Sequence, residues 1–301
     1  MIRISSDHSV TALGPGLPPA ATARSGDIVV FETLDCFANQ IVCESQRMGD
    51  IDETNANPAA GPLFIQGAEP GDTLKVEILS IKLDDHAVIC ELPGEGITGK
   101  GVEAESIKII PITEDGAVFS DRLALPLRPM VGVIGTCPAD ESISTETPDH
   151  HGGNLDCIHI TEGAAIYLPV LVKGAMLAIG DLHAVMGDGE VCVCGAEIAG
   201  EVAVRVSVEK NNRLPTPFVV TAENCMTIFS AETLDEAGEQ AVLRMRAFLM
   251  DCVGLSAADA GMLLSLTGDL RINQVVNPKK TCRMELPLSV LDKLGYHFST
   301  P

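Results

Sequence analysis

Two short loops hold most of the side chains that could do chemistry in this chain. The first reads "TPDHHGGNLD" (147–156) and the second reads "GDLHAVMGDGE" (180–190). Imidazole and carboxylate groups together suit Zn²⁺, whereas a set of Asn and Asp oxygens suits Ca²⁺ better. Asp181 and His183 are two residues apart, so on an extended backbone they would point the same way and could hold one ion. The candidate site residues in these loops are His151, Asn154, Asp156, Asp181, His183, Asp188 and Glu190.

Each loop alone is more often an ordinary turn, and the two histidines at 150 and 151 cannot both face one way on a strand. The chain has no phosphate-binding loop, dinucleotide glycine signature or Gly-x-Ser-x-Gly elbow. A cysteine nucleophile stays open. Cys137 follows an apolar run in a turn, but the neighbouring Asp140 and Glu141 would raise its pKa rather than lower it.

The segments that must position these loops read mainly as short strands. "SGDIVVFET" (25–33) and "PGDTLKVEI" (70–78) share a Gly-Asp turn followed by a β-branched run. The apolar phase of "LKVEILSIKL" changes at 78/79, which predicts a β-bulge or a strand that changes sheet. Residues 190–198 and 201–210 read as two strands joined by a hairpin-like link. Many short strands cut by Gly and Pro predict a β-sandwich or barrel-like body.

The last quarter of the chain has a different pattern. Thr233 with Glu236 predicts a capped helix over about 233–252, and Ser256 with Asp259 predicts a second one. A last strand is expected at 270–276. Residues 45–61 are the most polar stretch and could form a lid, although an ordinary surface loop is the more frequent outcome.

The composition excludes several classes of partner. A net charge of −22 disfavours nucleic acid and anionic membrane surfaces, and a small neutral substrate is compatible with it. No signal-peptide core or membrane-length apolar stretch is present, so we expect a cytoplasmic protein with reduced cysteines. Cys192 and Cys194 would share one face of a strand, where core packing is favoured over a thiolate metal pair. Strand edges in a long β-rich chain favour a homo-oligomer.

Several segments together resemble one known family, the acetamidase/formamidase family. The resemblance covers residues 7–290 and is most specific in the pairing of "HGGNLD" with "GDLHAVMGDGE". Other matching segments are "GDIVVFETLDCFANQI", "RPMVGVIGTCPADE", "EIAGEVAVRVSV" and "GDLRINQVVNPKKTCRMELP".

The resemblance implies a mainly β fold, with a β-sandwich-like (jelly-roll or CUB-like) body and a smaller α+β C-terminal part. We expect the body at 1–225 and the C-terminal segment at 226–301, packed on the same domain. It also implies hydrolysis of short aliphatic amides to a carboxylate and ammonia with a divalent metal. From the imidazole and carboxylate residue types we expect this metal to be zinc rather than calcium.

The family motifs also suggest roles for single residues. Asp35, Asp156, Asp181 and His183 are the expected metal ligands, and Glu190 is the expected proton shuttle, with His183 beside it in catalysis. Gln40, His151 and Asn154 would orient the amide, and Glu197 matches the Glu that follows the second loop. Three positions depart from the family pattern: Glu146, Asp149 and Met186.

Two other functions remain as alternatives: a non-catalytic metal or small-molecule binder on the same scaffold, and a structural component of an oligomer. An amidase with a cysteine nucleophile is the alternative mechanism.

Overall fold

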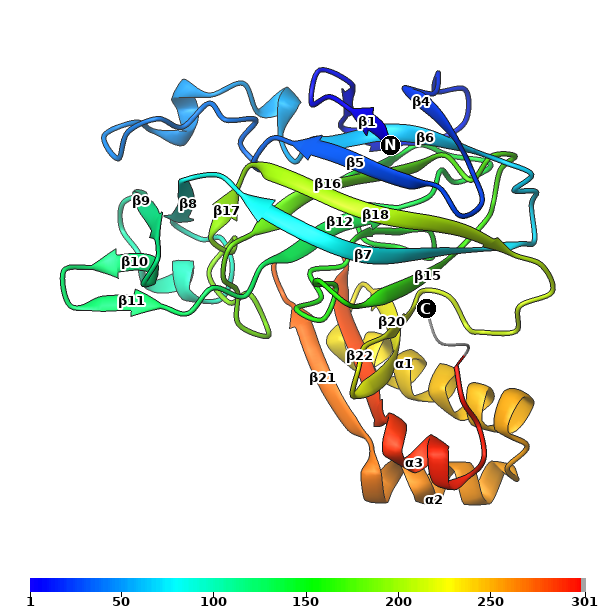
Figure 1. The fold of residues 1–301 in the computed structure, drawn as a ribbon. Coiled ribbons are helices and arrows are strands. Elements are labelled where there is room, and N and C mark those ends of the chain that lie inside the picture. Colours follow the sequence, from blue (N-terminus) through cyan, green and yellow to red (C-terminus); the bar gives the residue numbers. More distant parts are fainter. Residues whose placement is uncertain (299–301) are drawn as a thin grey trace.

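The computed structural model describes residues 1–298 and folds them mainly into two large β-sheets, with the α-helices near the C-terminus (Figure 1). Short 3₁₀ helices lie earlier, at Met48–Asp50, Glu53–Asn55 and Thr98–Gly101. The alternating apolar pattern of the sequence explains the packing of the sheets. In β18 (Gly200–Glu209), Val202, Val204 and Val206 are fully buried, whereas Glu201 and Arg205 between them stay partly exposed. The predicted mainly β, sandwich-like class is confirmed.

The first sheet places the two similar Gly-Asp segments on either side of β18. Leu79 has no partner in β18, because the register shifts between the pairs Ala203–Ser80 and Val204–Ile78. The predicted change of phase at 78/79 is therefore a β-bulge. The strands in spatial order are β1 (Ile2–Ile4), β5 (Ile28–Thr33), β18, β7 (Thr73–Leu83), β15 (Ala165–Pro169), β19 (Phe218–Val220), β20 (Asn224–Ala231), β22 (Lys280–Pro287) and β21 (Asp269–Gln274).

The second sheet carries the strands that hold the site. Its main path runs through β11 (Leu123–Leu125), β10 (Gly116–Ser120), β9 (Ser106–Thr113), β8 (His86–Glu91), β17 (Glu197–Ile198), β16 (Leu177–His183), β12 (Met130–Gly135) and β14 (Gly152–Asn154). Beside this path, β6 (Ala59–Gln66) pairs with β16, β2 (Ser9–Val10) and β4 (Ala21–Arg24), and a small separate sheet joins β3 (Ala12–Leu13) to β13 (Ile143–Ser144).

The main core lies between the two sheets. It combines Val29, Leu74 and Val204 of the first sheet with Val131 and Ile179 of the second. With few aromatic residues in the chain, aliphatic side chains fill this space, and each fully buried one contributes about 1.5–3 kcal/mol. None of the helices within residues 1–298 is long and apolar enough to cross a membrane.

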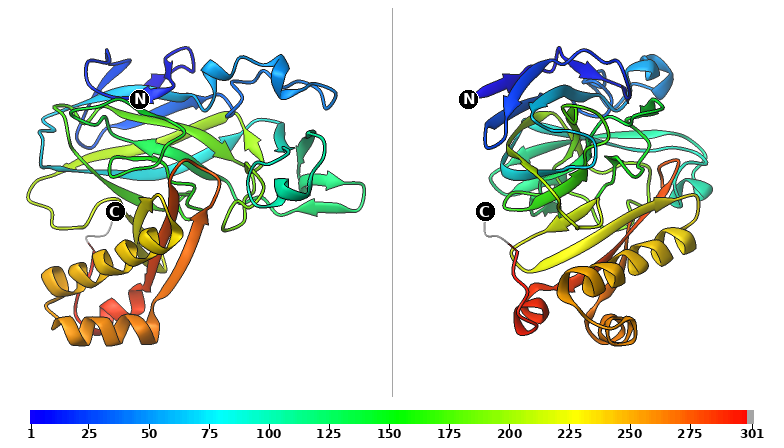
Figure 2. Two further views of the ribbon diagram at one scale, coloured as in Figure 1. Left: turned by 180° about the vertical axis from the view of Figure 1, so that it is seen from behind. Right: turned by 90° about the vertical axis from the view of Figure 1, so that its right-hand side faces the viewer.

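The C-terminal part packs its helices on one face of strands β20–β22 (Figure 2). Thr233 caps α1 (Leu234–Phe248) by accepting a hydrogen bond from the Glu236 N–H, and Ser256 caps α2 (Ala257–Thr267) in the same way, as the sequence predicts. The expected last strand is not the last element. β22 follows β21 and pairs with both β21 and β20, and α3 (Leu288–Lys293) follows β22.

The predicted hairpin between residues 190–198 and 201–210 is wrong. Only Glu197–Ile198 of the first segment is a strand, and it pairs with β16 and β8 in the second sheet. β18 pairs instead with β5 and β7 in the first sheet. The chain therefore crosses from one sheet to the other at Ala199, and residues 191–196 are free to form a loop beside the site.

Candidate active site

Strands β12 and β16 form the floor of the site. Their antiparallel pairing sets Gly132 opposite Asp181. A Cβ at Gly132 would collide with Asp181 Oδ2 and lie 2.7 Å from Asp156 Oδ1. Glycine is therefore required at this position, because any side chain would fill the space between the two carboxylates.

Four buried acids and one imidazole converge above Gly132. The Nε2 atom of His183 lies 3.1 Å from Glu197 Oε1, 3.6 Å from Asp181 Oδ2 and 3.9 Å from Asp156 Oδ1. One ligand atom each from Asp156, His183 and Glu190 falls within 4.8 Å of the others, and the same holds for Cys36, Asp181 and Glu197. The structure thus brings the end of the first sequence loop, at Asp156, together with both ends of the second, at Asp181–His183 and at Glu190.

Several polar atoms in this cluster have no hydrogen-bond partner within the described chain although they are buried. Leaving such a group unpaired costs about 1–3 kcal/mol, and more when it is charged, so native proteins rarely tolerate it without a ligand. The unpaired oxygen atoms are Asn154 Oδ1, Asp156 Oδ1, Glu190 Oε2 and Glu197 Oε2, and His183 Nε2 has only the carboxylate contacts given above.

The backbone is strained at the same place. Asp156, Asp181 and Glu190 have positive φ angles of 44°, 58° and 43°, in the left-handed region that residues with a Cβ seldom adopt. Strain of this kind costs of order 1–3 kcal/mol per residue and gathers at functional sites. For Asp181, the left-handed turn at the end of β16 brings its carboxylate to the His183 ring.

Burial and mutual repulsion raise the pKa values of three acidic side chains in the cluster. Burial, with the Asp181 charge beside it, raises the pKa of Asp156 to about 6. Burial also raises the pKa of Glu197 to about 8 and that of Glu190 well above its usual range. For His183, burial alone would lower the pKa, but the Glu197 and Asp181 carboxylates outweigh it and raise the pKa. A bound cation would relieve this crowding of negative charge.

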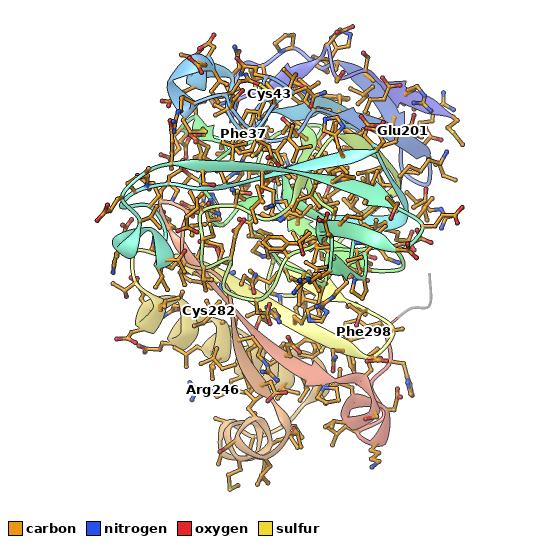
Figure 3. The ribbon with its side chains drawn as sticks, turned by 90° about the vertical axis from the view of Figure 1, so that its left-hand side faces the viewer. Phe37, Cys43, Glu201, Arg246, Cys282 and Phe298 are labelled. Carbon is orange, nitrogen blue, oxygen red and sulfur yellow. The ribbon has the colours of Figure 1, made fainter. Side chains whose placement is uncertain are left out.

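A cavity of about 450 Å³ opens onto the cluster. Asn154, Asp181, Glu190 and Glu197 line it on one side. The opposite wall comes from the connection between β5 and β6, which starts near Phe37 in the upper part of the molecule (Figure 3), from the residues after β8, and from the 191–196 loop. Residues 45–61, which the sequence left open as a lid or a plain loop, supply part of this wall through Met48, Ile51 and Glu53.

The β21–β22 hairpin supports both loops through hydrogen bonds, a role that the sequence did not predict. Asn277 donates a hydrogen bond of 2.6 Å to Asp156 Oδ2 and another of 3.1 Å to the Asn154 carbonyl. Buried Arg283 binds both carboxylate oxygens of Asp188 at 2.8 and 2.7 Å, two residues before Glu190. The signals in the sequence were the run "NQVVNPKK" and the resemblance of "GDLRINQVVNPKKTCRMELP" to the family, neither of which indicates a contact with the two loops.

Three predicted site residues lie outside the cluster. Asp35 accepts backbone N–H bonds from Phe37 and Asn39, so its carboxylate closes a turn. The side chain of Gln40 ties the loop to Asp52 through hydrogen bonds to its N–H and carbonyl. His151 is fully buried, and burial lowers its pKa to about 4. Asp35 and Gln40 do not line the cavity, and neither does His151.

The three residues that depart from the family pattern lie at different positions relative to the cavity. Glu146 lines the cavity, whereas Asp149 is held away from it by Lys279 and the His150 ring. Met186 places its sulfur 3.2 Å from Nδ1 of His183, on the side of the ring that faces away from the acids.

The position of Cys137 argues against its role as the catalytic nucleophile. Cys137 is fully buried between Leu13 and Ala178, does not line the cavity, and has its pKa raised to about 11 by burial. Cys192 and Cys194 lie in the loop rather than on a strand face. The Cys194 sulfur lies 3.6 Å from that of Cys90, and both residues line the cavity wall.

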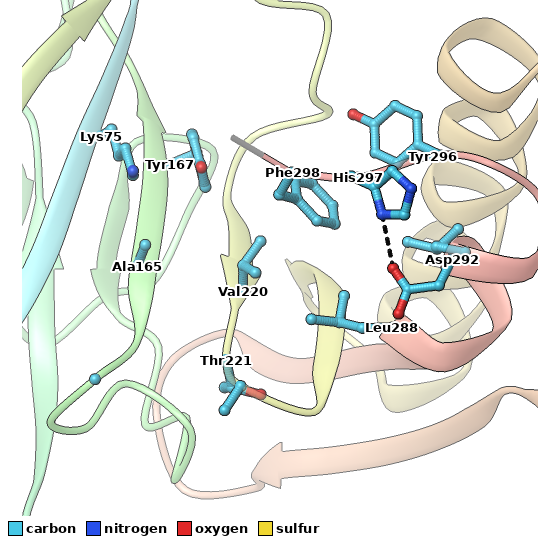
Figure 4. Close-up of a pocket in the computed structure, with 13 residues that line it drawn as sticks. Lys75, Ala165, Tyr167, Val220, Thr221, Leu288, Asp292, Tyr296, His297 and Phe298 are labelled. Carbon is cyan, nitrogen blue, oxygen red and sulfur yellow. Dashed lines mark hydrogen bonds and ion pairs between the residues drawn. The ribbon is translucent and has the colours of Figure 1, made fainter. Parts of the chain in front are cut away.

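A larger cavity of about 610 Å³ lies elsewhere, between β15 and the C-terminal segment (Figure 4). Lys75 and Tyr167 line one side, and Leu288, Phe298 and the ion pair His297–Asp292 line the other. It contains none of the residues of the buried acid cluster, so the smaller cavity is the candidate active site.

A strained, buried cluster of carboxylates and imidazole beneath a cavity, on a β-sandwich body, defines an enzyme site. Comparison with known proteins agrees. The profile of the Acetamidase/Formamidase family matches residues 8–144 and 123–293, and the chain belongs to that family. It is an amidase.

Solved structures and curated relatives agree with this assignment. An acetamidase from Bacillus halodurans is 48% identical over 98% of this chain and 100% of its own, with a TM-score of 0.97. A predicted acetamidase/formamidase from Thermoanaerobacter tengcongensis is 44% identical over 99% of each chain, with a TM-score of 0.96. The formamidase of Methylophilus methylotrophus is 29% identical over 75% of this chain and 72% of its own. The resemblance inferred from the sequence is confirmed.

Proposed function

We propose that this protein is a metal-dependent amidohydrolase that converts short aliphatic amides to a carboxylate and ammonia. The observation that carries the proposal is the set of buried oxygen atoms without hydrogen-bond partners, on Asn154, Asp156, Glu190 and Glu197, that surrounds the His183 ring. The names of the relatives, formamidase and acetamidase, supply the amide class.

The donor set fits a divalent cation, zinc rather than calcium, because it includes an imidazole nitrogen. We propose Asp156, Asp181 and His183 as the residues that hold it, with Glu197 beside them. Asp35 is left out of this set, since its Oδ1 accepts two backbone hydrogen bonds and its side chain neither lines the cavity nor joins the cluster. When bound, such a cation polarises the amide carbonyl and lowers the pKa of water.

The protein groups then have separate tasks. Glu190, which lines the cavity with one oxygen unpaired, takes a proton from water and passes it to the amide nitrogen, because ammonia leaves only after protonation. Asn154 presents its free Oδ1 to the amide N–H₂ group. Gln40 acts through the loop that it ties to Asp52, and His151, which does not line the cavity, has no direct contact with the amide.

Metal content of the purified protein and an amide panel test the proposal together. Formamide, acetamide and propionamide are assayed for ammonia release before and after chelation. We expect about one tightly held metal ion per chain, and loss of activity on chelation that zinc restores. His183→Ala and Glu190→Gln should remove turnover, whereas the exposed His297→Ala control should not.

The possible outcomes separate the alternatives. Full activity after complete removal of metal overturns the metal requirement. No turnover of any amide by metal-replete protein favours the non-catalytic binder. Loss of activity with a thiol reagent that persists in Cys137→Ala would point to another cysteine on the cavity wall, such as Cys36.

A further inference from the structure

The cavity is larger than the amides for which the relatives are named. A water molecule occupies about 30 Å³ of liquid, and on that scale acetamide, with four heavy atoms, needs roughly 120 Å³. The cavity offers about 450 Å³. A formyl or acetyl amide held at the acid cluster would therefore leave most of the space to water.

The two halves of the cavity differ in chemistry. The acid cluster lines one part of it, and mainly apolar side chains, with Glu53 and Glu95 among them, line the other. Phe37 packs there with Met48 and Ile51 of the β5–β6 connection, and with Leu92 and Val193. The thiols of Cys90 and Cys194 extend this wall, and neutral thiols behave as small apolar groups. An amide bound at the acids would direct its acyl group toward this apolar half.

The charge of the cavity narrows the choice of acyl group. Among the described lining residues there is no Lys or Arg, and Glu53, Glu95 and Glu146 add exposed carboxylates to the buried ones. An acyl group ending in a carboxylate would meet only like charge there. This charge excludes an anionic acyl group, and the apolar side chains of Phe37, Met48 and Ile51 favour an uncharged group over a cationic one.

We propose that the preferred substrates are neutral amides of apolar acids with about four to six carbons, rather than formamide or acetamide. This inference rests on the proposed function and specifies its substrate. Each methylene that enters the apolar half leaves water, and the corresponding transfer free energy amounts to about a three- to four-fold gain in kcat/KM per carbon.

A chain-length series tests the inference. The specificity constant kcat/KM is measured for acetamide, propionamide, butyramide, pentanamide and hexanamide, with succinamate as the anionic comparison to butyramide. We expect kcat/KM to rise about ten-fold or more from acetamide to butyramide. Succinamate should lie at least ten-fold below butyramide.

Substitutions at neighbouring positions test the location of the acyl group. Val193→Phe fills the apolar half and should reduce the ratio of pentanamide to acetamide kcat/KM at least ten-fold. Val191→Phe, two residues away and 48% exposed outside this cavity, should leave that ratio unchanged. If Val193→Phe does not fold, the chain-length series with the wild-type protein still tests the inference.

The outcomes distinguish this inference from the proposed function. Turnover of acetamide with no gain on lengthening the chain overturns the inference and leaves the amidase proposal standing. An equal rate on succinamate and butyramide overturns the charge argument, and the inference with it. No turnover of any amide overturns both.

Discussion

Arg283 offers a sharp test of how the C-terminal hairpin supports the site. Its side chain is 1% exposed and donates to both oxygens of Asp188, to Asn273 Oδ1 at 2.8 Å and to Glu285 Oε1 at 2.6 Å. Replacing it with methionine keeps much of the volume but removes all four bonds. Asp188 remains near the surface and regains water, whereas the carbonyl of fully buried Asn273 does not.

The expected loss of stability in Arg283→Met follows from the environments of Asp188 and Asn273. Removing one partner of a buried ion pair costs about 3–5 kcal/mol, and the partial exposure of Asp188 places Arg283→Met at the lower end, about 3 kcal/mol. At about 2–4 °C per kcal/mol for a large domain, the melting temperature should fall by about 6–12 °C. Because Asp188 is two residues before Glu190, kcat should fall as well, since the loop that carries Glu190 loses its anchor.

Urea unfolding and amide kinetics measure the two effects. Arg271→Met is the matched control, because Arg271 pairs with Arg283 across the β21–β22 ladder but forms only an exposed ion pair with Asp269. Its free energy of unfolding should change by less than about 0.5 kcal/mol. If Arg283→Met were as stable and as active as Arg271→Met, the reasoning that the hairpin anchors the active-site loop would be refuted.

Three further predictions concern other parts of the molecule. Asn277→Ala should weaken zinc retention by about 10–100-fold, measured by equilibrium dialysis, because Asp156 loses the hydrogen bond that orients it; unchanged retention would contradict the ligand assignment. Cys137→Ala should keep kcat within about two-fold while costing about 1 kcal/mol of stability, whereas a dead but folded variant would restore the cysteine mechanism. His159 and Arg283 hold the pKa of Glu285 at about 2 despite its burial, below the ordinary value near 4.5. Its contribution to stability should therefore be fully present above about pH 4.5 and be lost as the pH falls toward 2. Urea titrations at pH 6 and pH 3 should show the gap between wild type and Glu285→Gln shrinking at the lower pH, and a constant gap would exclude this linkage.

The sequence predicted the features that depend on interactions between residues close together in the chain. Alternation of valines specified β18, the change of phase at 78/79 marked the bulge, and Thr233 and Ser256 marked two helix starts, because each depends on neighbours only a few residues away. Local reading failed at residues 190–198, where the pattern suits a strand but the chain is leaving one sheet for the other.

The active site shows the same difference between features set by nearby residues and features set by distant ones. The residues alone identified the two loops, and their resemblance to one family identified the chemistry, so Asp156, Asp181, His183 and Glu190 were all named before any fold was known. Asp35 and Gln40 were placed with them because they share the family motif, but a motif does not show whether a carboxylate faces the cavity or its own turn.

Only the tertiary structure decided what surrounds those loops. Cys36 joins the cluster, and Asn277 and Arg283 support it. These residues lie up to about 250 positions apart in the chain, a separation at which sequence spacing carries no information about distance. The size of the cavity and its apolar wall likewise come from three separate segments packed together. Residue types and local periodicity determined the strands, the helix starts and the two loops, because these depend on near neighbours in the chain. Packing between distant segments determined where the acids converge and what can reach them.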